Sequence, residues 1–105
     1  MAIQNPIPIR LKEARKRAKL TQKELGCRIG MDENSASSRM NHYEKDRHTP
    51  DVQTLQRIAD ELGVPLNYFF CDSFESAELA CLIDKLSIEQ KKMLIQQINL
   101  QGRNV

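Results

Sequence analysis

The segment Glu33–Asp51, "ENSASSRMNHYEKDRHTPD", mixes small polar residues with a few apolar residues at helical spacing. Ala36, Met40 and Tyr43 stand at i, i+4 and i+7, which predicts one apolar stripe on a short helix that ends near Lys45. Asp32, Asn34 and Ser35 are the candidate caps at its start, and Ser35, Ser38, Arg39, Asn41, His42 and Lys45 are expected to face outward. A helix of this kind has a narrow apolar side and a wide edge of hydrogen-bonding groups, so it is suited to contact a polar ligand.

The residues before this segment predict a helix that packs closely against it. Thr21 and Glu24 have the spacing of a capping box, so a helix should begin at Gln22, and Gly30 is suited to end it. Gly26 falls in the middle of this helix, where glycine costs about 1 kcal/mol relative to alanine. We therefore expect another helix to cross very near Gly26.

Three more helical segments are expected around this pair. The first carries an apolar stripe and a basic outer face, the fourth is capped by Asp51 and ended by Gly63, and a short turn at Leu66–Phe70 should place Phe69 and Phe70 in the core. The stripe of the first helix is Ile7, Leu11, Ala14 and Ala18, and its basic face is Arg10, Lys12, Arg15, Lys16, Arg17 and Lys19. The inward residues of the fourth helix are Val52, Leu55, Ile58, Ala59 and Leu62.

The C-terminal segment predicts a hairpin of two helices that are more apolar than the hairpin can cover by itself. A second capping box, Ser87 with Gln90, divides the two helices. Their apolar residues include Leu79, Leu82, Ile83, Leu94, Ile95 and Ile98. Docking onto the preceding helices or pairing with a second copy would each bury this surface. We favour dimerisation, because a self-complementary patch readily generates a two-fold.

Composition and charge narrow the class of protein. The chain has 105 residues, of which 40% are hydrophobic and 29% charged, and these values describe one globular domain with an all-α tendency. No stretch approaches the roughly 20 apolar residues of a membrane span, no signal peptide is evident, and the three cysteines are expected to be reduced, buried thiols of a cytoplasmic protein. Residues 1–50 hold 11 Lys/Arg against 6 Asp/Glu, whereas residues 51–105 hold 5 against 8, which favours a polyanion-facing front half.

Taken together, these elements resemble the XRE, or Cro/repressor-type, helix-turn-helix family. The resemblance covers about Ile7–Phe70 and rests on "TQKELGCRIG", the polar helix, and "YEKDRHTPDVQTLQRIADELGVPLNYFF". It implies an all-α fold: a five-helix repressor-like DNA-binding core at 7–70, whose second and third helices form the helix-turn-helix. The predicted dimerisation hairpin would then occupy 75–100, with flexible ends at 1–6 and 101–105.

The resemblance also implies a site, with the third helix entering the major groove of double-stranded DNA. Arg39 can donate two parallel hydrogen bonds to guanine and Asn41 can bond adenine in the same way; the expected base-reading residues are Arg39, Asn41, His42 and Ser38. The expected phosphate contacts are Gln22, Lys23, Ser35, Ser37, Lys45, Arg47, Lys16 and Lys19. Arg15 and Glu44 match a family ion pair that positions the third helix against the first.

Two departures from the family pattern stand out. The chain is about four residues longer between Gly30 and Pro50, at "MDENSAS", and Asp46 stands where the family usually has glycine in a left-handed conformation. The segment "SxSxRMNxYEK" followed by two helices is similar to the controller proteins of restriction–modification systems, although prophage regulators share this build. The expected protein is thus bacterial or phage-encoded.

Other classes of function find less support. No nucleophile–base pair, phosphate loop or zinc spacing is present; His42 and His48 lie six residues apart without a nearby cysteine. We therefore predict a non-enzymatic homodimeric regulator with no cofactor and no metal. The alternative is an antitoxin-type interaction module with a protein partner, which would also bind DNA.

Overall fold

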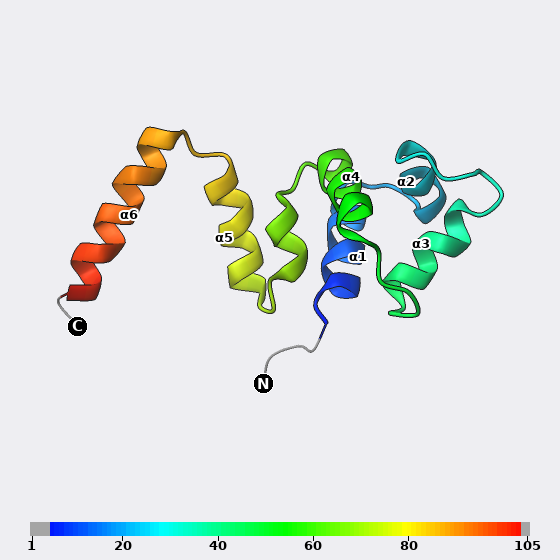
Figure 1. The fold of residues 1–105 in the computed structure, drawn as a ribbon, viewed down its shortest axis with the longest axis horizontal. Coiled ribbons are helices and arrows are strands. Elements are labelled where there is room, and N and C mark those ends of the chain that lie inside the picture. Colours follow the sequence, from blue (N-terminus) through cyan, green and yellow to red (C-terminus); the bar gives the residue numbers. More distant parts are fainter. Residues whose placement is uncertain (1–4, 104–105) are drawn as a thin grey trace.

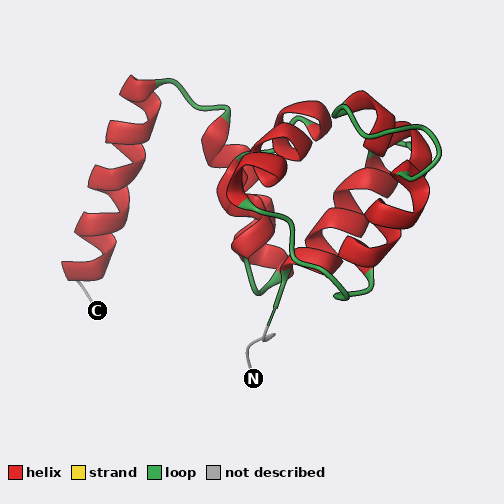
Figure 2. Cartoon of the chain, turned by 45° about the vertical axis from the view of Figure 1, so that its right-hand side comes forward, coloured by secondary structure: helices red, strands yellow, loops and turns green. Residues whose placement is uncertain are grey.

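In the computed structural model, which describes residues 5–103, every regular element is a helix (Figures 1 and 2). The elements are α1 (Ile7–Arg17), α2 (Gln22–Arg28), α3 (Ala36–Glu44), α4 (Val52–Leu62), the 3-10 helix η1 (Leu66–Phe70), α5 (Phe74–Asp84) and α6 (Ile88–Arg103). The molecule is elongated, 56 × 32 × 22 Å, with α2 and α3 at one end and α6 at the other (Figure 1). The all-α prediction is confirmed.

Local side-chain caps stand at the starts of α2, α4, α5 and α6. The Thr21 hydroxyl accepts from the Glu24 N–H at 3.0 Å, and the Glu24 carboxylate accepts from the Thr21 N–H at 2.9 Å. Asp51 accepts from the Thr54 N–H at 2.7 Å at the start of α4. These bonds stabilise the charged carboxylates, so the backbone N–H of Thr21 lowers the pKa of Glu24 and that of Thr54 lowers the pKa of Asp51. Both predicted caps are confirmed, as is the second capping box, whose two bonds measure 2.9 and 3.1 Å.

The core lies between α1, α3, α4 and η1. Its buried hydrophobic residues are Ile7, Leu11, Ala14, Leu20, Leu25, Ala36, Met40, Leu55, Ile58, Ala59, Tyr68, Phe69 and Ala77. Three residues expected inside are exposed instead: Ala18, Val52 and Phe70. Ala18 follows the last turn of α1 and Val52 is the first residue of α4, where no element covers them. A 3-10 helix has three residues per turn, so Phe69 faces inward while Phe70 turns away.

Arg10, expected on the basic outer face, is buried, with 4% of its surface exposed. Its Nε donates to the Cys71 carbonyl at 3.1 Å, and its Nη1 donates to the Glu13 carboxylate at 2.8 Å. Glu13 also accepts from the Tyr68 hydroxyl. Burial and the Glu13 carboxylate raise the pKa of Tyr68 well above its ordinary value. Because each buried polar group has a partner, this network joins α1 to η1 without an uncompensated charge.

The two C-terminal helices differ from a closed hairpin. Ala77 of α5 is buried against the core and Cys81 is half-buried there, so α5 packs on η1. By contrast, α6 lies apart from the other helices (Figures 1 and 2). The expectation of buried cysteines was wrong: Cys27 is exposed and Cys71 and Cys81 are partly exposed, although all three are free thiols.

Part of the chain ends that were expected to be flexible lies within the described residues. Residues 101–103 continue α6, and the Asn5 amide donates to Asp46 Oδ1 at 2.8 Å. The rest of the expected flexible ends, 1–4 and 104–105, lies outside the described residues.

Candidate nucleic-acid interface

The close packing of α2 against α3 presents one edge of α3 outward. A Cβ atom built on Gly26 would lie 2.8 Å from the Ala36 Cβ and 3.1 Å from the Ala36 carbonyl oxygen. No real Cβ tolerates the shorter distance, so only glycine allows the two helices to approach this closely. The expected crossing near Gly26 is confirmed, and it explains a glycine in the interior of α2.

The lengthened segment before α3 forms an extra turn. The N–H groups of Ser35 and Ala36 both donate to the Asp32 carbonyl, at 3.0 and 2.9 Å, and the Asp32 carboxylate accepts from the Asn34 N–H at 2.8 Å. Ser35 stands at the N-cap of α3 but its side chain caps no N–H of that helix. The extra residues are therefore absorbed before α3, and Ser37 is exposed on its first turn.

Glu44 at the end of α3 is the centre of a hydrogen-bond cluster. Its carboxylate accepts from Arg15 Nε at 2.5 Å, from Arg15 Nη2 at 3.0 Å and from Gln22 Nε2 at 3.1 Å. Arg15 Nη1 donates in addition to the Leu20 carbonyl at 2.8 Å. The Glu44 side chain is 2% exposed and that of Arg15 is 11% exposed. The cluster thus joins α1, α2 and α3 at one buried point behind the outer edge of α3.

The same cluster orients Asn41. The Glu44 carboxylate can only accept, so the Gln22 amide nitrogen must face it. This nitrogen also donates to Asn41 Oδ1 at 3.2 Å. Asn41 is half-buried, and its oxygen is engaged within the protein while its NH₂ group remains a donor.

A polar hollow of about 330 Å³ lies beside the outer edge of α3. It is lined by Arg39, His42, Tyr43, His48 and Thr49. The two imidazole rings lie 5.4 Å apart, and each of the five side chains can donate a hydrogen bond. His48 and Thr49 were not among the site residues predicted from the sequence. The only sequence signal for them was the six-residue spacing of His42 and His48, which is a weak pattern for a metal site and does not indicate a polar hollow.

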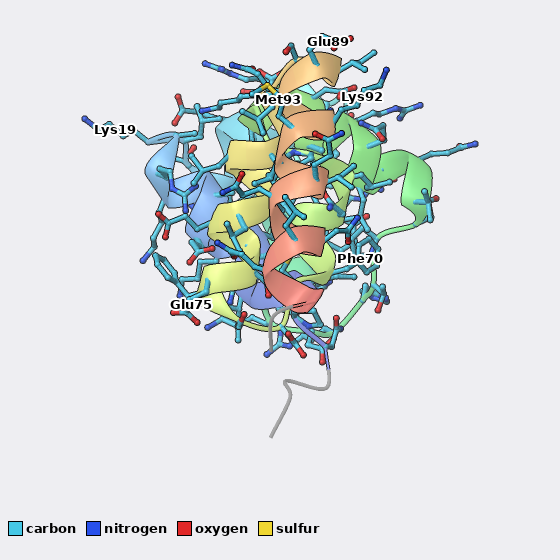
Figure 3. The ribbon with its side chains drawn as sticks, turned by 90° about the vertical axis from the view of Figure 1, so that its left-hand side faces the viewer. Lys19, Phe70, Glu75, Glu89, Lys92 and Met93 are labelled. Atoms are coloured by element: carbon cyan, nitrogen blue, oxygen red, sulfur yellow. The ribbon has the colours of Figure 1, made fainter. Side chains whose placement is uncertain are left out.

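The residues expected to contact phosphates fall into two groups. Gln22 is half-buried beside Asn41, and Ser35 is half-buried before α3, whereas the cations are exposed. Those exposed cations are Lys16, Lys19, Lys23, Lys45 and Arg47. Lys23 pairs with Glu33 at 3.3 Å, and Lys19 projects outward from the turn between α1 and α2 (Figure 3). Lys19 and Asp46 both have positive φ, 60° and 59°, which agrees with the left-handed residue expected at Asp46.

Comparison with known proteins identifies this arrangement. The sequence pattern of a helix-turn-helix domain matches residues 9–71, which include all of α2 and α3. The chain belongs to the XRE-type helix-turn-helix family. The helix-turn-helix protein is 46% identical to the transcriptional regulator BswR, whose crystal structure superposes with a TM-score of 0.80 over 90% of this chain and 93% of that one.

A second relative of this helix-turn-helix protein is the HTH-type transcriptional regulator ImmR of Bacillus subtilis (strain 168). The two are 37% identical over 59 residues, which are 56% of this chain. The match spans less than half of ImmR, 43% of its length. The helix-turn-helix protein is thus supported as a transcriptional regulator by its family and by its match to almost all of BswR.

The helix-turn-helix protein exposes most of the residues expected at a dimer interface. Leu79 and Leu82 are each 55% exposed, Ile83 is 38%, Ile95 is 58% and Ile98 is 57%. Leu94 is half-buried. These side chains do not close on one another within the chain.

Two further observations concern residues 5–103. No group of three or more His, Cys, Asp or Glu side chains in this range has the arrangement of a metal site. No helix in the same range has both the length and the apolar character to cross a membrane.

Proposed function

We propose that this regulator binds an inverted-repeat operator as a homodimer, with α3 of each copy in the major groove. The observation that carries the proposal is the outer edge of α3: Ser38 and Arg39 are exposed, and Asn41 and His42 are half-buried beside them. This edge is held from behind by the Glu44 cluster. A fixed helix with an open polar edge has the form that a major groove admits.

In this proposal, Arg39 and Asn41 select the base sequence by different chemistry. Arg39 donates two parallel hydrogen bonds to guanine O6 and N7, worth about 1–3 kcal/mol of discrimination. Asn41 keeps its oxygen on Gln22 and offers its NH₂ group, so it reads an acceptor such as a purine N7. His42 and Ser38 complete the base contacts.

The exposed cations supply affinity that does not depend on sequence. We assign Lys16, Lys19, Lys23, Lys45 and Arg47 to phosphates, with Gln22, Ser35 and Ser37 as neutral donors. Each phosphate neutralised releases counterions and steepens the dependence of affinity on salt by about 0.9 in the log–log slope. His48 and Thr49 belong to the same group, because they line the polar hollow beside α3.

The test of specificity is selection of bound duplexes from a random library, followed by substitution of Arg39. Selection should enrich an inverted repeat. Arg39→Ala should then weaken binding by about 1–3 kcal/mol for the selected base pair and relax the preference there. Arg57→Ala is the matched control, since Arg57 is exposed on α4, outside this edge. An equal loss on every sequence would make Arg39 a phosphate contact.

The same selection separates regulation from the antitoxin-type alternative. Folded protein that enriches no sequence at low salt would favour a module whose main ligand is a protein partner. We propose that the regulator acts in the cytoplasm and is encoded by a bacterium or a phage. Its extra turn at Asp32–Ser35 favours the subgroup of restriction–modification controller proteins. A methyltransferase–endonuclease pair as the neighbouring genes would support that placement.

A further inference from the structure

Helix α6 lacks the tertiary packing that normally stabilises a helix. It runs for 16 residues at one end of the molecule and lies apart from the other helices (Figure 1). Ile88 is 70% exposed, and Ile95 and Ile98 are more than half exposed. Isolated helices of about this length are marginal in water, and most helices in proteins depend on burial of an apolar face. A surface from outside the chain must therefore cover α6.

Helix α5 has a second apolar face, opposite the core. Ala77 packs inward, whereas Leu79, Leu82 and Ile83 stand at i, i+3 and i+4 and are all exposed. This spacing places the three side chains on one stripe. We call this stripe the outer face of α5.

The turn between α5 and α6 keeps this outer face open within the chain. The Lys85 and Leu86 N–H groups donate to carbonyls of the last turn of α5, and Ser87 and Gln90 cap the start of α6. A hollow of about 220 Å³ remains where the two helices diverge, lined on one side by Ala80 and Ile83 and on the other by Lys91. Beyond this turn, α6 does not pack along α5 of its own chain.

The two helices carry opposite charge. Glu75, Glu78 and Asp84 make α5 acidic, and within residues 5–103 they form no ion pair. Lys91 and Lys92 lie near the start of α6 and outnumber its one acidic residue, Glu89, whose carboxylate is 4.0 Å from Lys92 Nζ. Figure 3 shows Lys92 and Met93 near that start. Acidic α5 thus attracts α6 and repels another α5.

We propose that two copies exchange their last helices, so that α6 of each copy packs on the outer face of α5 of the other. Leu94, Ile95 and Ile98 would meet the Leu79, Leu82 and Ile83 stripe of the second copy. This inference rests on the proposed homodimer and specifies its contact. The contact can be no longer than α5, whose 11 residues span about 16 Å, so two exchanged contacts form a small interface, near the lower limit of about 1,200 Å² for stable complexes.

The test is a charge exchange between the two helices. One variant carries Glu75→Lys and Glu78→Lys, and the other carries Lys91→Glu and Lys92→Glu with an affinity tag. Either variant alone brings like charges together at both exchanged contacts. A mixed dimer has opposite charges at both contacts, so native mass spectrometry after mixing should show it well above the statistical half of all dimers. Asp60→Lys on α4 is the matched control and should mix statistically with the second variant, since Asp60 lies outside α5.

Each outcome decides something different. A statistical mixture of the two charge variants, or two dimers that do not mix, would overturn the exchange and leave the homodimer standing. Enrichment of mixed dimers that contain the Asp60→Lys control would also overturn it, because with the second variant it indicates contacts between two α6 helices and with the first variant contacts between two α5 helices. Sedimentation of the unmodified chain as a monomer at tens of micromolar would overturn the homodimer as well. Circular dichroism checks that every variant remains helical. A variant that unfolds would be replaced by its single substitutions, Glu78→Lys and Lys92→Glu, which leave more of the charge pattern intact.

Discussion

The replacement of Glu44 by glutamine tests how α3 is held in place. The wild-type carboxylate accepts three hydrogen bonds, two from Arg15 and one from Gln22, at 2.5, 3.0 and 3.1 Å. Glutamine keeps the shape but has one acceptor oxygen, and its NH₂ group must face another donor. Arg15 keeps its bond to the Leu20 carbonyl but loses its buried counter-charge.

The expected cost follows from burial. Breaking a buried ion pair by removal of one partner costs about 3–5 kcal/mol. The Leu20 carbonyl still accepts a hydrogen bond from the Arg15 guanidinium in this variant. We therefore expect Glu44→Gln to lower the free energy of unfolding by about 3 kcal/mol, at the lower end of that range. This is a large share of the ~5–15 kcal/mol that stabilises a typical domain.

Urea unfolding followed by far-ultraviolet circular dichroism measures this loss. Glu61→Gln is the matched control, since the Glu61–Arg28 pair, at 3.2 Å, is partly exposed on the surface. We expect this control to lose less than about 1 kcal/mol. A Glu44→Gln loss of about 0.5 kcal/mol or less, equal to the control, would refute the view that the cluster fixes α3. DNA affinity should fall in Glu44→Gln even where the protein remains folded.

Three further predictions concern single positions. Gly26→Ala should destabilise the protein by about 1–3 kcal/mol in urea, because its Cβ meets that of Ala36, whereas Gly102→Ala, with open space around it, should be neutral or stabilising. Asp46→Gly should raise the melting temperature by a few degrees, because glycine relieves the cost of a positive φ, about 1–2 kcal/mol. The variant loses only one surface hydrogen bond, from Asn5. An unchanged or lower melting temperature would show that this bond contributes more than the backbone strain costs. The pKa of Asp51 is lowered in the folded state, so its stabilisation is present above the ordinary value of 3.8 and is lost as the pH falls through the lower folded value. Thermal unfolding should therefore depend less steeply on pH below 4 in Asp51→Asn than in the wild type, and equal slopes would argue against this cap.

The sequence predicted features whose partners are close along the chain. Thr21 and Glu24 are three residues apart, and so are Ser87 and Gln90, so each capping box is visible as a short pattern. The glycine in the middle of α2 also predicted a close crossing, because its cost in a helix required compensation. Periodicity located the buried stripe of α3 for the same reason.

The features that could not be predicted from the sequence depend on partners far apart along the chain or on the angle between two helices. Arg10 is buried because a carbonyl 61 residues away accepts its Nε–H, and nothing in a basic helix face reveals that partner. Phe70 is exposed because η1 is a 3-10 helix, whose tighter turn changes which side faces inward. The splay of α6 depends on the backbone geometry of the short turn before Ser87. Apolar periodicity shows that both helices need cover but not at what angle they diverge.

The cluster behind α3 also bears on how the operator preference of such a protein can change in evolution. Arg39 is exposed and takes no part in the bonds of Glu44, so its replacement alters the edge of α3 and leaves the folded scaffold unchanged. Asn41 shares the Gln22 amide with Glu44, so a new side chain there disturbs the bonds that join α1, α2 and α3. New binding sites should therefore arise first by mutation at Arg39. A change at Asn41 should become tolerable only after a second mutation has restored the partner of Gln22.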